Sequence, residues 1–304
     1  MGTPAAAVPS LKRILEDGHE VVAVYTQPDR PAGRGNRLKA SPVKEFALEN
    51  HLKIYQPTRI KTPEALEIFK SHNADAAVVV AYGRILPETF LHAFEKGAIN
   101  VHFSLLPKYR GAAPVNWAIV GGETKTGVTT MQMDAGLDTG AILLQRESEI
   151  SEYETAPELM EKLSFLGAGL LSETLAMYDE LTAQPQDESQ SSLAPILKKE
   201  DGLIDWSQSA FVIERRIRGF QPWPNAYTKF DSKSLILWEA QPTISVTSGI
   251  SNGEVIVAQK DELVVQCGER TALRVLEVQP EARKRMAARD FINGMRLKVG
   301  DRFG

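Results

Sequence analysis

Short runs rich in Val and Ala recur through the first 150 residues with helical patterns between them, and this alternation constrains the fold more than any other feature. The runs show little polar alternation, which is typical of strands that are covered on both faces. Three of the helical patterns have a proline at the start, where a first helical turn tolerates it. The alternation predicts βαβ units around a parallel sheet, an α/β fold. Strands are expected at 21–26, 76–81, 98–102 and 128–133, and helices at 8–17, 41–50, 63–72 and 113–120.

The second half of the chain has a different pattern. A long helical pattern covers 155–183, and the following residues, 183–194, are polar and contain proline, as linkers often are. Beyond this point the sequence predicts one amphipathic helix and five short strands, the pattern of a small β-barrel. We therefore expect a first domain at 1–183, a linker at 184–203 and a second domain at 204–304. The helix is expected at 207–219 and the strands at 226–230, 234–240, 253–258, 262–266 and 272–278.

Composition excludes several classes of protein. With 43% hydrophobic and 24% charged residues, the chain is neither disordered nor fibrous. No uncharged apolar run approaches the roughly 18 residues of a membrane span, and residues 1–20 carry charges in place of a signal-peptide core, so a cytoplasmic protein without a membrane contact is expected. A lone cysteine, Cys267, and five scattered histidines give no metal-ligand spacing, so no metal is expected.

The charge is unevenly distributed, although the net value is only −4. Residues 27–44 hold five basic residues against one acid, and residues 283–302 hold seven against two. Such patches are either solvated charge runs or contacts for phosphate groups. The basic residues singled out are Arg34, Arg37 and Lys39 in the first patch and Arg283, Lys284 and Arg285 in the second.

Two motifs follow predicted strands and carry polar side chains suited to catalysis. Asn100 and His102 are two residues apart on one strand, so their side chains project to the same face near its carboxyl end, where open parallel sheets bind ligands. Residues 133–140 (MDAGLDTG) follow another strand and contain Asp134 and Asp138, which are either turn residues or a source of a carboxylate for the imidazole. We expect the two loops to leave the same edge of the sheet.

Three other motifs give weaker evidence about function. The G-x-G within 30–38 lacks the third glycine of a dinucleotide fingerprint, which disfavours a nicotinamide dehydrogenase. The G-x-S-x-G at 249–253 matches the nucleophile motif of hydrolases, but no histidine follows it, and we interpret it as a hairpin turn. Trp223, between two prolines within 218–224, is interpreted as a structural wedge of the second domain.

Taken together, segments along nearly the whole chain resemble the methionyl-tRNA formyltransferase family of folate-dependent formyltransferases. The Asn-x-His and Leu-Asp-x-Gly set indicates the superfamily, and the PAGRG loop together with a second domain indicates the members that act on tRNA. The matching segments are 2–4 (GTP), 25–35 (YTQPDRPAGRG), 41–44 (SPVK), 78–87 (VVVAYGRILP), 99–114 (INVHFSLLPKYRGAAP), 127–140 (GVTTMQMDAGLDTG), 204–207 (IDWS) and 220–224 (FQPWP).

The resemblance implies a Rossmann-like formyltransferase domain at 1–183, followed by an OB-like β-barrel that binds tRNA. It implies 10-formyltetrahydrofolate as the formyl donor, the α-amine of methionyl initiator tRNA as the acceptor, no metal and a monomer. Its catalytic residues fall on Asn100, His102 and Asp138, its folate-binding turn on Ser104, Leu105, Leu106 and Pro107, and its tRNA-acceptor loop on 28–41 with Arg34.

The chain departs from the family pattern at two places. Phe103 occupies a position where relatives usually have a small residue. The family also has an apolar strand immediately before the GTP turn, and here Met1 stands where that strand ends. We therefore expect a sheet that lacks this strand, with unpaired backbone groups on its two neighbours.

Other functions are kept open by the sequence. Within the superfamily these are a formyltransferase that acts on a nucleotide-sugar amine or a ribonucleotide amine, and a formyltetrahydrofolate hydrolase. From a different class, the chain could be an inactive relic that binds tRNA without folate. The PAGRG loop and the basic second domain favour the tRNA enzyme.

Overall fold

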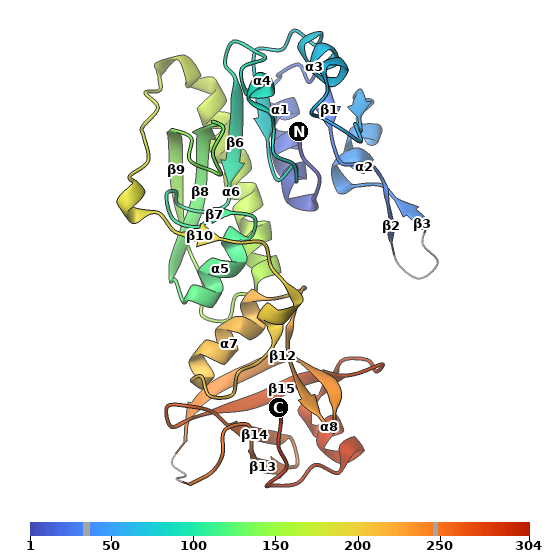
Figure 1. Cartoon of the computed structure of the whole chain (residues 1–304), viewed down its shortest axis with the longest axis vertical. Coiled ribbons are helices and arrows are strands. Elements are labelled where there is room, and N and C mark those ends of the chain that lie inside the picture. The colour runs from blue at the N-terminus through green and yellow to red at the C-terminus, as the bar shows by residue number, and fades with distance from the viewer. Residues whose placement is uncertain (33–36, 246–248) are drawn as a thin grey trace. The chain divides into compact units, whose positions relative to one another are not determined.

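The computed structural model describes residues 1–32, 37–245 and 249–304. Its contacts divide the chain into two compact units. Unit 1 comprises Met1–Pro114, Lys125–Glu149 and Met160–Pro195, and unit 2 comprises Val115–Thr124, Ile150–Leu159 and Ile196–Gly304. Figure 1 gives the order of the elements along the chain.

Unit 1 is built on a four-stranded sheet in the order β5–β6–β8–β9. The strands are β5 (Ala77–Val79), β6 (Ala98–His102), β8 (Lys125–Gln132) and β9 (Ile142–Glu149). β5 and β6 pair in parallel, as expected, whereas β8 pairs antiparallel with both β6 and β9. A second, two-stranded parallel sheet joins β1 (Val24–Tyr25) to β4 (Ile54–Tyr55).

The edges of β1 and β5 that face each other are bridged only by the first two residues of the described chain. The Met1 amino group donates to the Val78 carbonyl at 2.6 Å, the Val80 amide donates to the Met1 carbonyl at 2.9 Å, and the Gly2 amide donates to the Tyr25 carbonyl at 2.9 Å. Beside these residues lies a cavity of about 140 Å³, lined mainly by apolar side chains of 21–25 and 74–80. Within the described residues, β1 and β5 are thus joined through Met1 and Gly2 and do not pair with each other.

The helices of unit 1 begin where the sequence places a cap and a proline. The side chains of Ser41 and Thr62 accept the amides of Lys44 and Ala65, and the residue after each cap is proline. Caps of this kind satisfy amides that have no partner within the helix. The helices are α1 (Val8–Glu16), α2 (Pro42–Glu49), α3 (Pro63–Lys70), α4 (Glu88–Leu91) and the long α6 (Ala156–Ala176).

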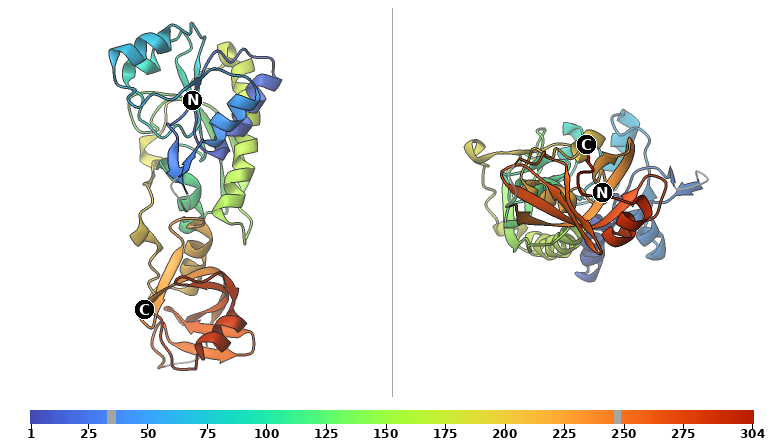
Figure 2. Two further views of the ribbon diagram at one scale, coloured as in Figure 1. Left: turned by 90° about the vertical axis from the view of Figure 1, so that its right-hand side faces the viewer. Right: turned by 90° about the horizontal axis from the view of Figure 1, so that it is seen from below.

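One face of the sheet is covered by α6, which runs alongside β6 and β8 in both views (Figures 1 and 2). Thr174 of α6 hydrogen-bonds to Thr130 of β8 at 2.7 Å. A Cβ atom at Gly167 would lie 2.9 Å from Val101 and 3.5 Å from the Phe103 ring, so glycine leaves room for the sheet side chains here. The bulky Phe103 is thus accommodated, with only 6% of its surface exposed.

Unit 2 contains an antiparallel sheet in the order β11–β12–β15–β14–β13, with β16 beside β15. Every strand predicted in this region is present to within two residues at its start. β12 is longer than predicted. Among the described strands, its second half, which includes Pro242, pairs only with β15. Proline has no amide hydrogen to donate, and because no strand lies beside Pro242 on the β11 side, no hydrogen bond is lost there. The strands are β11 (Ala226–Phe230), β12 (Lys233–Ile244), β13 (Val255–Gln259), β14 (Glu262–Gln266), β15 (Thr271–Pro280) and β16 (Met286–Ala287).

Two further helices pack on this sheet, α7 (Ala210–Gly219) and α8 (Ala288–Met295), and α5 (Pro114–Gly121) falls largely in unit 2. The core is an apolar cluster that includes Trp206, Phe230, Phe291 and Phe303. Within the described ranges, no helix is long and apolar enough to cross a membrane. The short strands that remain are β2 (Arg30–Ala32), β3 (Arg37–Lys39), β7 (Arg110–Gly111) and β10 (Leu193–Ala194), and the 3-10 helices are Ala5–Ala7, Tyr178–Glu180, Glu188–Gln190 and Lys199–Gly202.

Candidate active site

The carboxyl-terminal half of β6 carries Asn100 and His102, both buried, at 8% and 5% exposure. Pairing on both sides fixes this strand, since Asn100 lies opposite Val79 of β5 and Met131 of β8. Alternation along the strand places the two side chains on one face, as predicted. The Asn100 amide makes no hydrogen bond to another residue in the part of the chain that the structure describes, so its donors remain available to a ligand.

The His102 ring lies between two oxygen atoms. Its Nε2 lies 3.0 Å from the Tyr109 carbonyl oxygen, and its Nδ1 lies 3.6 Å from Oδ2 of Asp138. The second distance is too long for a direct hydrogen bond but short enough for a strong charge interaction. The Asp138 side chain is 15% exposed and that of His102 is 6% exposed, so solvent screens the pair only partly.

Asp138 approaches the imidazole by a route that the sequence did not predict. We expected the two loops to leave the same edge of the sheet, and this was wrong, because β8 runs antiparallel to β6. The connection from β8 to β9 starts at the other end of β6 and folds back. Asp138 has a left-handed backbone (φ 54°), and its Oδ2 accepts the Gly111 amide at 2.8 Å.

The other acid of this loop, Asp134, is a turn residue. Its Oδ1 accepts the Gly136 amide at 3.0 Å and the Thr139 hydroxyl at 2.7 Å. Of the two readings left open for the pair of aspartates, the turn reading therefore holds for Asp134, while Asp138 faces the histidine.

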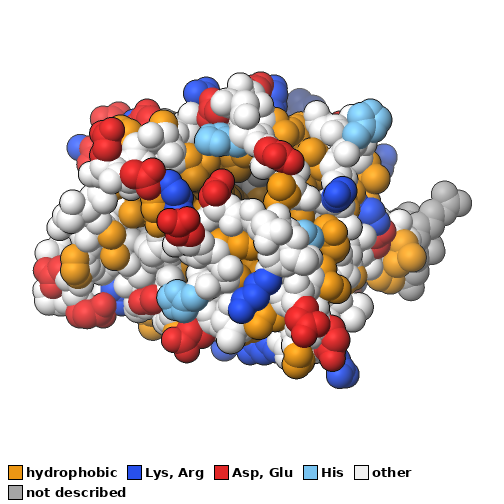
Figure 3. All heavy atoms as spheres, turned by 90° about the horizontal axis from the view of Figure 1, so that it is seen from above, with side chains coloured by type: hydrophobic (Ala, Val, Ile, Leu, Met, Phe, Trp, Pro, Cys, Tyr) orange, Lys and Arg blue, Asp and Glu red, His pale blue; other side chains and the backbone are white. Residues whose placement is uncertain are grey.

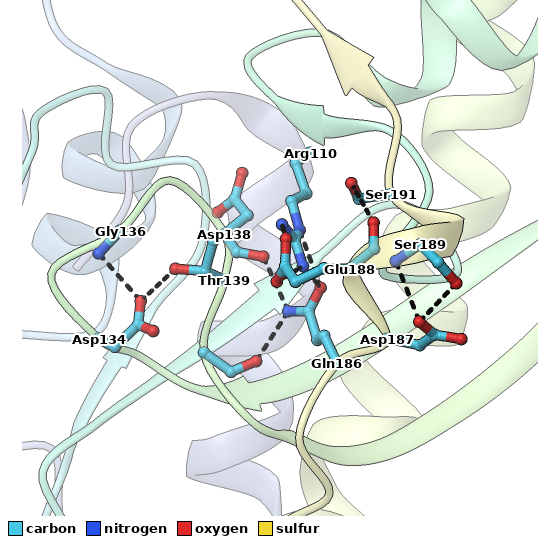
Figure 4. A network of polar contacts seen from close by, with 11 residues as sticks. Arg110, Asp134, Gly136, Asp138, Thr139, Gln186, Asp187, Glu188, Ser189 and Ser191 are labelled. Carbon is cyan, nitrogen blue, oxygen red and sulfur yellow. Dashed lines mark hydrogen bonds and ion pairs between the residues drawn. The ribbon is translucent and has the colours of Figure 1, made fainter.

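A polar network beside Asp138 involves three residues that sequence reasoning missed (Figure 4). Buried Arg110 donates two hydrogen bonds to Oε1 of Gln186, at 2.8 and 2.9 Å, and two to the Glu188 carboxylate, both at 2.8 Å. Through these bonds Glu188 raises the pKa of Arg110, and Arg110 lowers the pKa of Glu188. Arg110 lies inside a segment that carries the family resemblance, but nothing in the sequence singles out Gln186.

The chain segment that carries Gln186 and Glu188 is held against unit 1 by β10, which pairs in parallel with β7. Gly111 in β7 has φ 125°, and a Cβ atom there would lie only 2.6 Å from the Ala194 carbonyl oxygen. Glycine is therefore required for this close approach. The residues just after α6 thus pack beside the site, up to Pro195.

Hydrogen bonds to a buried side chain of the sheet hold the predicted folate turn, Ser104–Pro107, in place. Thr129 of β8 donates to the Ser104 carbonyl at 2.7 Å and accepts the Leu106 amide at 3.1 Å. Ser104 and Leu106 are buried, whereas Leu105 and Pro107 are half-buried. The side chains of Leu105 and Pro107 are therefore the more accessible of the four.

The basic residues predicted to bind tRNA differ in exposure and in their contacts. Arg34 lies outside the described residues, as does the side chain of Arg37, while Lys39, Arg283 and Lys284 are exposed. Arg285 is already engaged, because it pairs with Glu277 and stacks 5.0 Å from the Trp238 ring centroid. On the face drawn in Figure 3, Lys and Arg are interspersed with Asp and Glu. Among the residues described, no cluster of three potential ligands could hold a metal ion.

Comparison with known families places this geometry in context. Residues 1–175 match the formyl transferase family, and residues 196–296 match the formyl transferase C-terminal domain. A curated methionyl-tRNA formyltransferase from Solibacter usitatus is 51% identical, covering all of this chain and 97% of the relative. This chain belongs to the methionyl-tRNA formyltransferase family. Family members from Geobacter metallireducens and Caldanaerobacter subterraneus are 48% and 49% identical, each aligned over 97% of its length.

Solved structures with lower sequence identity share the fold of this formyltransferase. An N-formyltransferase from Helicobacter canadensis, in complex with folinic acid and dTDP-3-aminofucose, has a TM-score of 0.66 at 19% identity, covering 92% of this chain and 97% of its own. The sugar 3N-formyltransferase WlaRD has a TM-score of 0.65 at 20% identity, with coverages of 93% and 97%. At this identity the likeness establishes the fold only.

Proposed function

We propose that this protein transfers the formyl group of 10-formyltetrahydrofolate to the α-amine of methionine on the initiator tRNA, for translation initiation. The observation that carries the proposal is the full-length identity of 44–51% to enzymes that bear this name. The juxtaposition of an asparagine, a histidine and a carboxylate at one end of β6 supports it chemically.

In the proposed reaction the methionine amine attacks the formyl carbon, which becomes tetrahedral and carries an oxyanion. The Asn100 amide donates a hydrogen bond to this oxygen, and His102 Nε2 donates a second one after exchanging the Tyr109 carbonyl for it. Asp138 stabilises the imidazolium from the Nδ1 side and, directly or through water, takes the proton that the amine loses. The C–N10 bond then breaks, N10 takes up the proton that Asp138 received, directly or through water, and tetrahydrofolate leaves with the Asp138 carboxylate restored.

Substrate binding is assigned as follows. Leu105 and Pro107 contact the folate, and Ser104 and Leu106 shape the turn that presents them. Arg34, Arg37 and Lys39 bind the acceptor end of the tRNA, and the exposed basic residues Arg283 and Lys284, with Arg285, contact its phosphates.

We further propose a first domain at 1–183, a linker at 184–203 whose residues up to Pro195 pack on the first domain, and a second domain at 204–304. We also propose a monomeric state and a cytoplasmic location, where charged initiator tRNA is found. A formyltransferase for a nucleotide-sugar amine is less well supported, since the structures of that class are only 19–20% identical to this chain.

The test is a formylation assay with purified protein, 10-formyltetrahydrofolate and three acceptors: methionyl initiator tRNA, methionyl elongator tRNA and a dTDP-amino sugar. We expect rapid transfer to the initiator tRNA alone. Preferred transfer to the amino sugar would assign the chain to the other class, and folded protein that binds tRNA without transfer to any acceptor would support the inactive relic.

A further inference from the structure

The Gln186 side chain links the two loops that meet at His102. Its Nε2 donates to the carbonyl oxygens of Asp138 and Gly140, at 2.8 and 2.7 Å, and its Oε1 accepts from Arg110. Arg110 and Gly111 belong to the loop after β6, whereas Asp138 and Gly140 belong to the connection after β8. Figure 4 shows Gln186 between Arg110 and Asp138. One amide side chain therefore bridges both.

The orientation of this amide is fixed by its partners. Arg110 can only donate, so it selects the oxygen end of Gln186, and the two backbone carbonyls can only accept, so they select the nitrogen end. Arg110 is in turn held by both carboxylate oxygens of Glu188 and is only 5% exposed. The bridge is thus a side chain with one fixed orientation.

The residue that the bridge holds needs such support. Asp138 is in the left-handed region, which is unfavourable for a residue with a Cβ atom and persists when the surroundings enforce it. Its carboxylate oxygen is fixed by the Gly111 amide and its carbonyl by Gln186, so both ends of the residue are tied. Without the second tie, the Gly111 amide alone would hold the residue, and the backbone of Asp138 would be free to shift and change the distance from its carboxylate to the imidazole.

We propose that Gln186, oriented by Arg110 and Glu188, is a positioning residue that holds Asp138 in its reactive geometry toward His102. This inference rests on the proposed function. Its consequence is that a residue from the stretch after α6, remote in sequence from the reacting groups, controls the rate of formyl transfer and leaves substrate binding unchanged.

The first test compares Gln186→Met with Gln190→Met. Methionine has a similar length to glutamine and no charge, and Gln190 is an exposed residue of the same segment whose side-chain amide donates to Asp187. We expect kcat of Gln186→Met to fall on the order of 10- to 100-fold, as misplacement of a catalytic group does, with both KM values within about threefold. Gln190→Met should match the wild type. Equal kcat values for the two variants would refute the proposal.

The second test is a double-mutant cycle with Asp138→Asn. If Gln186 acts through Asp138, replacing it should cost much less in the Asp138→Asn background than in the wild type. If replacing Gln186 lowers kcat by the same factor in that background, Gln186 acts elsewhere. If its role is purely structural, the melting temperature and the active fraction fall while kcat per active site is unchanged.

A second variant and the wild-type assay distinguish failure of this inference from failure of the proposed function. If Gln186→Met does not fold, Gln186→Glu keeps the acceptor for Arg110 and replaces the donor to the two carbonyls by a charged oxygen that they repel, so it must show a loss of kcat at least as large for the proposal to stand. A folded wild-type protein that transfers no formyl group to methionyl-tRNA would overturn the proposed function, whereas an active wild type with a fully active Gln186→Glu would overturn this inference alone.

Discussion

Replacing Asp138 by asparagine removes a charge while keeping the shape of the side chain. The asparagine oxygen can still accept the Gly111 amide, so the loop should keep its conformation. What is lost is the attraction between carboxylate and imidazolium over 3.6 Å. That attraction is about 5 kcal/mol at an effective dielectric constant of about 20, and about 1 kcal/mol in bulk water. Because both side chains are at least 85% buried, we place the loss toward the upper value.

At 1.36 kcal/mol for each factor of ten, these limits correspond to a fall in kcat between about 5-fold and about 5,000-fold, and we expect at least about 100-fold. The assay is single-turnover formylation of methionyl initiator tRNA, with tRNA binding measured separately and expected to be unchanged. Asp134→Asn is the matched control, since the same change is made in the same loop at a residue whose carboxylate accepts hydrogen bonds from Gly136 and Thr139. A rate for Asp138→Asn within threefold of the control would refute the reasoning.

Three further predictions follow from the site and from unit 2. Asn100→Ala and His102→Ala should each lower kcat by about 10²–10³-fold in the same assay, as loss of an oxyanion donor does, and near-wild-type rates would remove them from the mechanism. The KM for tRNA should rise steeply with salt, with a logarithmic slope of about one for each phosphate contact, while the KM for folate moves little; a flat response would exclude phosphate contacts. Arg218→Met should destabilise unit 2 by roughly 3–5 kcal/mol at pH 8, because it leaves the Glu214 carboxylate buried without its partner. Burial already raises the pKa of Glu214, so the contribution of this group to stability is greatest when it is protonated and falls as pH rises through its folded-state pKa. Urea unfolding should therefore show that Arg218→Met loses less stability at pH 5 than at pH 8. Equal losses of stability at the two pH values would contradict the argument.

Features encoded by neighbouring residues could be predicted from the sequence. The strand Ala98–His102 was predicted at its observed limits, and the helices that begin with Pro42, Pro63 and Pro114 start within one residue of the prediction. Alternation also placed Asn100 and His102 on one face correctly. Each of these features is decided within about ten residues of chain, where side-chain pattern and capping chemistry act.

Features decided by remote contacts could not be predicted in the same way. A buried strand has the same apolar pattern in either direction, so the antiparallel course of β8 was missed, and with it the route that brings Asp138 to His102. Gln186 lies 76 residues from Arg110, in a polar stretch that resembles a linker. Its hydrogen bonds to backbone carbonyls require only an amide of the right length, and such a requirement leaves no motif.

The pairing of β10 with β7 determines where the chain can be cut. A fragment that ends with α6 at Ala176 would contain Asn100, His102 and Asp138 and would look like a complete catalytic unit. It would nevertheless remove both Gln186 and Glu188, so the buried Arg110 guanidinium would lose the four hydrogen bonds that now satisfy it. Dissection of this enzyme into independently folding parts should therefore keep the chain intact as far as Pro195, the last residue of unit 1.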